Sequence, residues 1–108
     1  MCHAFVIDDE PEIRMALQQS FDLEGIQAQF FDSAEAAIHG LKQTTPHVII
    51  SDIRLPGVSG LDLLQRVLHQ HPAMPIILIT GHGDISMAVE AMHLGAYDFI
   101  EKPFLFKC

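Results

Sequence analysis

The chain of 108 residues contains short apolar runs rich in β-forming residues, and each run ends at a residue with a chemically useful side chain. Val48–Ser51 leads into Asp52, and Ile76–Ile79 leads into Thr80. Such unbroken apolar runs are typical of strands in a parallel sheet that helices cover on both faces. Ligands and reacting groups of these sheets lie at the carboxyl ends of the strands, so Asp52 is placed where chemistry is expected.

Two further strand ends carry charged side chains. Asp8 and Asp9 follow the apolar run Ala4–Ile7, and Lys102 follows the run over residues 97–101. If all four strands belong to one parallel sheet, their carboxyl ends share one edge. The sequence therefore predicts that two acidic strand ends, a hydroxyl and an ammonium group meet at that edge.

Helical patterns separate the strands. Apolar residues recur at helical spacing after Pro11, after Ser33, after Gly60 and after Asp84, and residues 26–31 form one more strand. Strands that alternate with helices indicate parallel pairing through right-handed crossovers, which is an α/β fold. We expect one domain over residues 1–108 with five strands and four complete helices, truncated where a fifth helix would begin.

Charge and cysteine content restrict the possible partners. Six basic residues against fourteen acidic ones give a net charge of −8, without any basic cluster, which argues against direct binding to nucleic acid or an anionic membrane. Mg²⁺ is a more natural partner for this charge. No apolar run approaches the length of a membrane span. Cys2 and Cys108 form no disulfide framework and are interpreted as free thiols of a cytoplasmic protein.

The four strand ends suit phosphoryl chemistry. Mg²⁺ prefers oxygen ligands and is usually held by one or two carboxylates plus a phosphate, which Asp8, Asp9 and Asp52 can provide. An aspartate can also act as a nucleophile and form an acyl phosphate. Lys102 would then neutralise charge on the phosphoryl oxygens, while the Thr80 hydroxyl would donate a hydrogen bond to them.

Each of these residues also has a simpler interpretation. Asp9 can be a helix N-cap with Glu12 as its capping-box partner, and Asp52 can form an Asx turn before Pro56. Thr80 can be an ordinary strand residue and Lys102 a solvated charge. Their joint occurrence at four strand ends is what these interpretations leave unexplained.

The motifs in order resemble the receiver domain of two-component response regulators. The resemblance rests on residues 6–10 (VIDDE), 52–56 (DIRLP) with Gly60, Thr80–Gly81 and 102–104 (KPF). Residues 80–104 are most similar to the sigma-54-dependent activators of the NtrC type, particularly the C4-dicarboxylate transport regulator. FixJ-type regulators are similar here too.

This resemblance implies a doubly wound, flavodoxin-like (CheY-like) parallel sheet of strand order 2-1-3-4-5. It implies that Asp52 is the phosphoacceptor, that Asp8, Asp9, Asp52 and the Arg54 carbonyl surround Mg²⁺, and that Thr80 and Lys102 contact the phosphoryl group. Phe99 falls at the position of the family's switch aromatic. The resemblance also implies partners for the domain. They are a sensor histidine kinase, an effector with ATPase and DNA-binding parts beyond residue 108, and a second copy in a homodimer.

Two functions of different classes follow from these patterns. The first is a signalling module that is not an enzyme, apart from its own phosphorylation and autodephosphorylation. The alternative is an Asp-nucleophile, Mg²⁺-dependent phosphohydrolase of the haloacid-dehalogenase type. That family needs an Asp-x-Asp at its first strand and usually a cap insertion, and the sequence shows neither.

Overall fold

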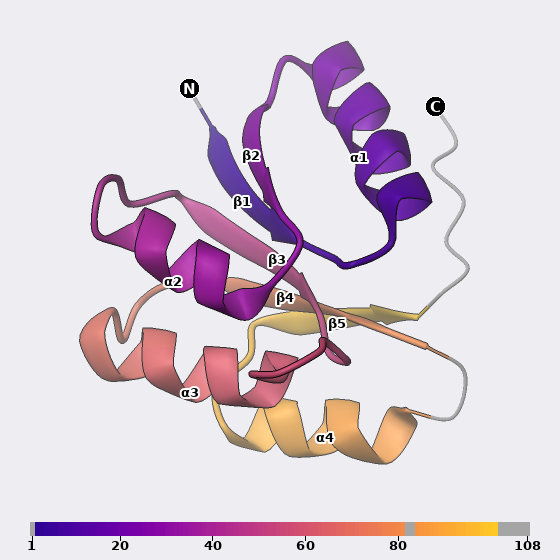
Figure 1. Cartoon of the computed structure of the whole chain (residues 1–108). Coiled ribbons are helices and arrows are strands. Elements are labelled where there is room, and N and C mark those ends of the chain that lie inside the picture. The colour runs from indigo at the N-terminus through magenta and orange to yellow at the C-terminus, as the bar shows by residue number, and fades with distance from the viewer. Residues whose placement is uncertain (1, 82–83, 102–108) are drawn as a thin grey trace.

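The chain folds into a three-layer α/β structure, shown as a computed structural model in Figure 1. The structure describes residues 2–81 and 84–101. Its strands are β1 (His3–Ile7), β2 (Gln27–Phe31), β3 (Val48–Asp52), β4 (Ile76–Thr80) and β5 (Asp98–Glu101). Its helices are α1 (Pro11–Glu24), α2 (Ala34–Leu41), α3 (Gly60–Gln70) and α4 (Ile85–His93).

All neighbouring strands pair in parallel, in the order β2-β1-β3-β4-β5. This confirms the predicted α/β class and the 2-1-3-4-5 order. The order reverses between β1 and β3, and the carboxyl ends of strands at such a switch point diverge enough to admit a ligand. The segment in which a fifth helix was expected to begin lies outside the described residues.

Two hydrophobic clusters cover the two faces of the sheet. Figure 1 shows α2, α3 and α4 on one face and α1 on the other. The larger cluster joins Phe5, Ile7 and Ile49 to Leu63 and Leu64 of α3, all at most 1% exposed. The smaller cluster joins strand residues to the α1 side: Val6 and Ile79, with Leu17 and partly buried neighbours. Successive residues of β1 thus point to opposite faces, as the pleat of a strand requires.

Local signals fix the helix ends. The Ser33 hydroxyl accepts a hydrogen bond from the Ala36 N–H (3.1 Å), and the Ser59 hydroxyl accepts one from the Asp62 N–H (3.2 Å). Both serines therefore cap the helices that follow them. Gly25 ends α1 in the left-handed conformation (φ 71°), which glycine adopts without steric cost. In the described part of the chain, no helix is long and apolar enough to cross a membrane.

Candidate functional site

An acidic cluster lies at the switch point of the sheet. Asp52 is the last residue of β3 and Asp8 directly follows β1, its neighbour, so the pairing of Ile7 with Ser51 brings the two carboxylates to one edge. Glu10, at the start of α1, joins them. One ligand oxygen from each of Asp8, Glu10 and Asp52 lies within 4.8 Å of the other two.

Turns at the two strand ends orient these carboxylates. The Glu10 N–H donates to Asp8 Oδ1 (2.8 Å), and the Arg54 N–H donates to Asp52 Oδ1 (3.0 Å). Each contact spans two residues and forms an Asx turn, which holds an aspartate side chain against its own backbone. The Asx-turn interpretation of Asp52 is thus confirmed, and it coexists with a place in the acidic cluster.

The burial of the cluster is uneven. Asp8 is fully buried and Asp52 is 5% exposed, whereas Glu10 is exposed. Carboxylates this close repel one another when all are charged, and low dielectric strengthens the repulsion at the buried pair. A cation lowers that energy, and three carboxylate oxygens suit a hard ion such as Mg²⁺ or Ca²⁺. The residues present therefore fit a divalent metal, with an open side at Glu10.

Asp9 lies between Asp8 and Glu10, and its role as a metal ligand stays a prediction. It is exposed and does not belong to the group formed by Asp8, Glu10 and Asp52. It is not the N-cap of α1 either, because Glu10 stands there, without a capping hydrogen bond from its side chain. Glu10 was missed as a candidate site residue, although three consecutive acids after a strand were a visible signal.

Thr80 and Phe99 occupy neighbouring strands beside the cluster. Thr80 ends β4 one residue beyond Ile79, the register partner of Asp52, and is fully buried. Its hydroxyl donates to the Ile100 carbonyl at 3.5 Å, at the outer limit of a hydrogen bond. Phe99 on β5 is half-buried and packs against the larger core cluster. Lys102 lies outside the described residues.

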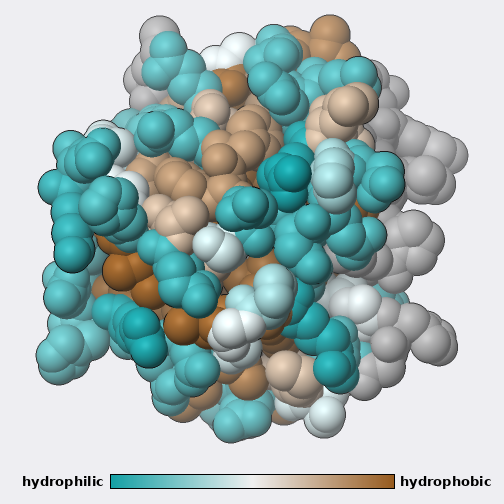
Figure 2. All heavy atoms as spheres, in the orientation of Figure 1, coloured by the Kyte–Doolittle hydropathy of each residue, from teal (hydrophilic) through white to brown (hydrophobic). Residues whose placement is uncertain are grey.

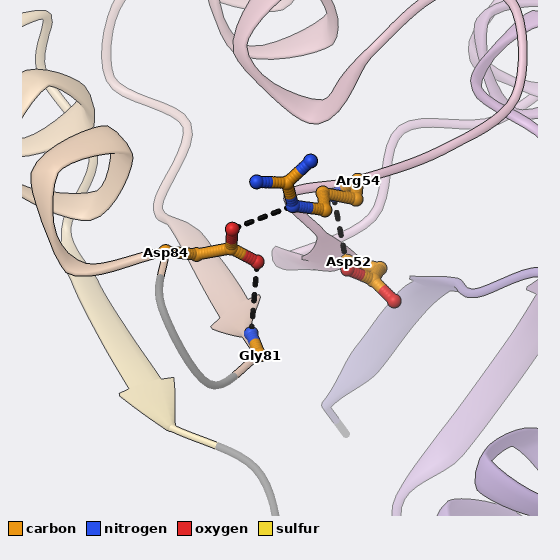
Figure 3. Close-up of polar contacts among 4 residues, drawn as sticks. All are labelled: Asp52, Arg54, Gly81 and Asp84. Carbon is orange, nitrogen blue, oxygen red and sulfur yellow. Dashed lines mark hydrogen bonds and ion pairs between the residues drawn. The ribbon is translucent and has the colours of Figure 1, made fainter.

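An ion pair between the exposed Arg54 and the buried Asp84 connects two loops at this edge. Arg54 Nε lies 2.5 Å from Asp84 Oδ1, and the Gly81 N–H donates to Asp84 Oδ2 (3.3 Å). Figure 3 shows the Asp84 side chain between Gly81 and Arg54, with Arg54 also tied to Asp52 through its backbone. The sequence interpretation missed this pair, since the two residues are 30 positions apart and no pattern connects them.

A groove lies elsewhere on the molecule. Hydrophobic side chains gather over α2 and α3 in Figure 2, with hydrophilic ones around them. A cavity of about 530 Å³ opens between these helices, lined by Ile38, Leu41, Lys42, Gln65, Arg66, Val67, His69, Gln70 and His71. None of these residues belongs to the acidic cluster, so the groove is separate from the site.

Comparison with known proteins agrees with this arrangement. Residues 4–107 match the model of the response regulator receiver domain family. The chain belongs to this family. It is 50% identical over 100 residues to the C4-dicarboxylate transport transcriptional regulatory protein DctD of Rhizobium meliloti, covering 93% of this chain and 22% of that protein. It is 44% identical over 102 residues to the transcriptional regulatory protein FixJ of Bradyrhizobium diazoefficiens, covering 94% of this chain and 50% of that protein.

Solved structures give the same result. The receiver domain of NtrX from Brucella abortus superimposes with a TM-score of 0.90 at 39% identity, covering 94% of this chain and 87% of that one. The chain is thus a receiver domain of two-component response regulators, a family that is not in itself a class of enzymes. The match does not favour the phosphohydrolase alternative. The chain spans 22% of the DctD protein and half of FixJ, which are transcriptional regulators from bacteria.

Proposed function

We propose that this domain accepts a phosphoryl group on Asp52 from a sensor histidine kinase. One observation carries the proposal: in a receiver domain, Asp52 ends the central strand with the carboxylates of Asp8 and Glu10 beside it. An Asp52 carboxylate oxygen would attack phosphorus, a new P–O bond would form, and the bond from phosphorus to the kinase histidine nitrogen would break. Hydrolysis of the acyl phosphate by water would reset the domain.

The acidic cluster would hold Mg²⁺ during this transfer. Asp8, Asp52 and the Arg54 carbonyl are the proposed ligands, together with Asp9, as the family resemblance implies, or Glu10, which lies nearer in the structure. When bound, the ion would neutralise negative charge on the phosphoryl oxygens. The Asx turns at Asp8 and Asp52 would keep both carboxylates in place without further reorganisation.

Thr80, Lys102 and Phe99 would respond to the phosphoryl group. The Thr80 hydroxyl, held only at 3.5 Å from the Ile100 carbonyl, would turn toward the phosphoryl oxygens, where Lys102 would add its positive charge. The half-buried Phe99 ring would then turn inward. Phosphorylation would thereby shift the balance between two arrangements of β4, α4 and β5.

The proposed output is regulation of transcription in the bacterial cytoplasm. The domain would control an effector of the sigma-54-dependent ATPase and DNA-binding type, as the family resemblance implies, and its relative DctD is a transcriptional regulatory protein. Its charge of −8 supports a role without direct contact to nucleic acid. Homodimerisation would be one way in which the switch reaches the effector.

The phosphoacceptor assignment can be tested by mass spectrometry. Incubation with acetyl phosphate and Mg²⁺ should add one phosphoryl group, and acetate should leave. Asp52→Asn should accept none, because an amide is not a comparable nucleophile, while the exposed Asp62→Asn on α3 serves as the matched control. Full labelling of the Asp52 variant would overturn the assignment.

The metal ligands can be separated by a second experiment. Mg²⁺ titration of Glu10→Gln and Asp9→Asn, monitored by amide NMR, compares two adjacent substitutions that each replace a carboxylate by a neutral amide. If Glu10 is the third carboxylate ligand, Glu10→Gln weakens Mg²⁺ binding more than Asp9→Asn does. The reverse order would support Asp9 as the ligand, as the family resemblance implies, and unchanged binding in both would remove the third carboxylate from the site.

A further inference from the structure

Asp84, at the start of α4, has an unusual side-chain arrangement for its position. It occupies the N-cap position of this helix, yet its side chain makes no capping hydrogen bond. Aspartate is among the residues best suited to cap a helix, and Ser33 and Ser59 do cap α2 and α3. The Asp84 carboxylate instead points to the Gly81 N–H and the Arg54 guanidinium (Figure 3). The Asp84 backbone (φ −99°, ψ 17°) is also not extended as it is at Ser33 and Ser59, so a capping contact would require the start of α4 to rearrange.

The two donors that hold Asp84 are also neighbours of Asp52. The Arg54 N–H is bound to Asp52 Oδ1, so the Arg54 side chain begins beside the proposed phosphoacceptor. Gly81 directly follows Thr80, which ends the strand paired with β3. A doubly charged phosphoryl group on Asp52 would need donors of these two kinds, a guanidinium and a backbone amide. Asp84 already uses both.

Burial makes this contact sensitive. The Asp84 side chain is only 4% exposed, whereas the Arg54 side chain is 67% exposed. Arg54 can therefore turn toward a new anion while it remains in water. A buried carboxylate that loses its cation becomes unfavourable where it is. Asp84 would then leave its present position, and the start of α4 would move with it.

We propose that Asp84 is an internal anion that competes with the phosphoryl group of Asp52 for Arg54 and Gly81. Phosphorylation displaces the Asp84 carboxylate, which then caps α4 through an amide of its first turn, at Ser86 or Met87. Asp84 and Arg54 are positioning residues of the switch. This inference rests on the proposed function, since it requires that Asp52 carries the phosphoryl group.

Beryllofluoride, which mimics a phosphoryl group on a carboxylate, provides the test. Its affinity in the presence of Mg²⁺ is measured by amide NMR titration for the wild-type chain and for Asp84→Asn. Asparagine caps a helix as well as aspartate does, but its uncharged amide cannot form an ion pair with Arg54. The variant should bind beryllofluoride about fivefold more tightly or better, because the competing ion pair is gone. Asp62→Asn is the matched control and should leave the affinity unchanged.

A double-mutant cycle distinguishes competition from a general loosening of the loop. Arg54→Gln removes the donor that both anions need, so adding Asp84→Asn to it should change the affinity little. Asp84→Ala, which cannot cap α4, should gain less than Asp84→Asn. In the wild-type chain, beryllofluoride should slow hydrogen exchange at Ser86 or Met87. Equal gains for Asp84→Asn in both backgrounds would overturn the proposal.

Failure of the inference can be told apart from failure of the proposed function. If the wild-type chain binds no beryllofluoride and accepts no phosphoryl group, the assignment of Asp52 fails. If the wild-type chain binds it and Asp84→Asn binds it equally, only the competition fails. If Asp84→Asn does not fold, Arg54→Gln still decides, because loss of the exposed guanidinium should shift the amides of Gly81 and of residues 85–88 without ligand. Unshifted amides there would contradict the proposal.

Discussion

Helices α2 and α3 begin differently from α4, although all three cover the same face of the sheet. Each of α2 and α3 begins with a serine that caps it, and α3 contributes the fully buried Leu64 to the core. By contrast, α4 begins at Asp84, whose side chain does not cap it, and Val89 on its surface is 47% exposed. Elements with fewer buried contacts and incomplete end bonds open at lower free energy. We therefore expect α4 to open at lower free energy than α2 and α3, which form the scaffold.

The apolar surface follows the same division. Most of the large hydrophobic side chains that are exposed in the described part of the chain lie on α4, in the segment after it, or on β5. They are Ile85, Val89, Met92, Leu94, Tyr97 and Ile100, with Met15 and Leu23 on α1 as the others. A gathered apolar surface marks a place where a partner can bind. The helix that we expect to open more easily therefore also carries apolar surface on which a partner could bind.

Truncation of a core leucine should have the largest effect on stability. Leu64→Ala on α3 should lower the free energy of unfolding by about 2–5 kcal/mol, because it leaves a cavity in a fully buried cluster. Val89→Ala on α4 should change it by about 0.5 kcal/mol or less, as is usual for exposed positions. Urea denaturation followed by circular dichroism measures both. Equal losses would mean that α4 is as firmly packed as α3.

Substitution of Gly60, the first residue of α3, should have the next largest effect on stability. A methyl group on Gly60 would lie 2.5 Å from the Asp52 carbonyl oxygen and 2.7 Å from Ile53 Cα, and both are backbone atoms that cannot move independently. Gly60→Ala should therefore cost about 1–3 kcal/mol, as overpacked positions do, and should also slow labelling of Asp52. Denaturant melts and acetyl phosphate labelling would show both effects.

Gly25→Ala is the control for Gly60→Ala. Nothing lies near its added methyl group, so only its left-handed backbone is strained. It should lower stability without changing the labelling of Asp52. If Gly60→Ala is labelled at the wild-type rate, the close approach of α3 does not hold the phosphoacceptor loop in place.

The sequence was sufficient for the fold and for part of the site. Apolar runs and helix signals predicted the five strands and four helices, because strand burial and capping are local properties. The meeting of Asp8 with Asp52 followed from adjacent parallel strands. Glu10 and the Arg54–Asp84 pair were missed, because side-chain direction in a loop and contacts across 30 positions depend on tertiary packing. The assignment of Asp9 as metal ligand remains a prediction.

The caps of the scaffold should have a smaller effect than the core leucine or Gly60, and they bear most directly on the comparison. Ser33→Ala and Ser59→Ala should each cost about 1 kcal/mol, because each leaves a helix N–H without its acceptor. Ser59 lies in the same β3–α3 connection as Arg54, yet its hydroxyl serves only α3 in the contacts described. Its loss should therefore lower the melting temperature and leave beryllofluoride affinity unchanged. If Ser59→Ala shifts that affinity as strongly as Asp84→Asn does, α3 takes part in the switch, and the division into a fixed side and a moving side is wrong.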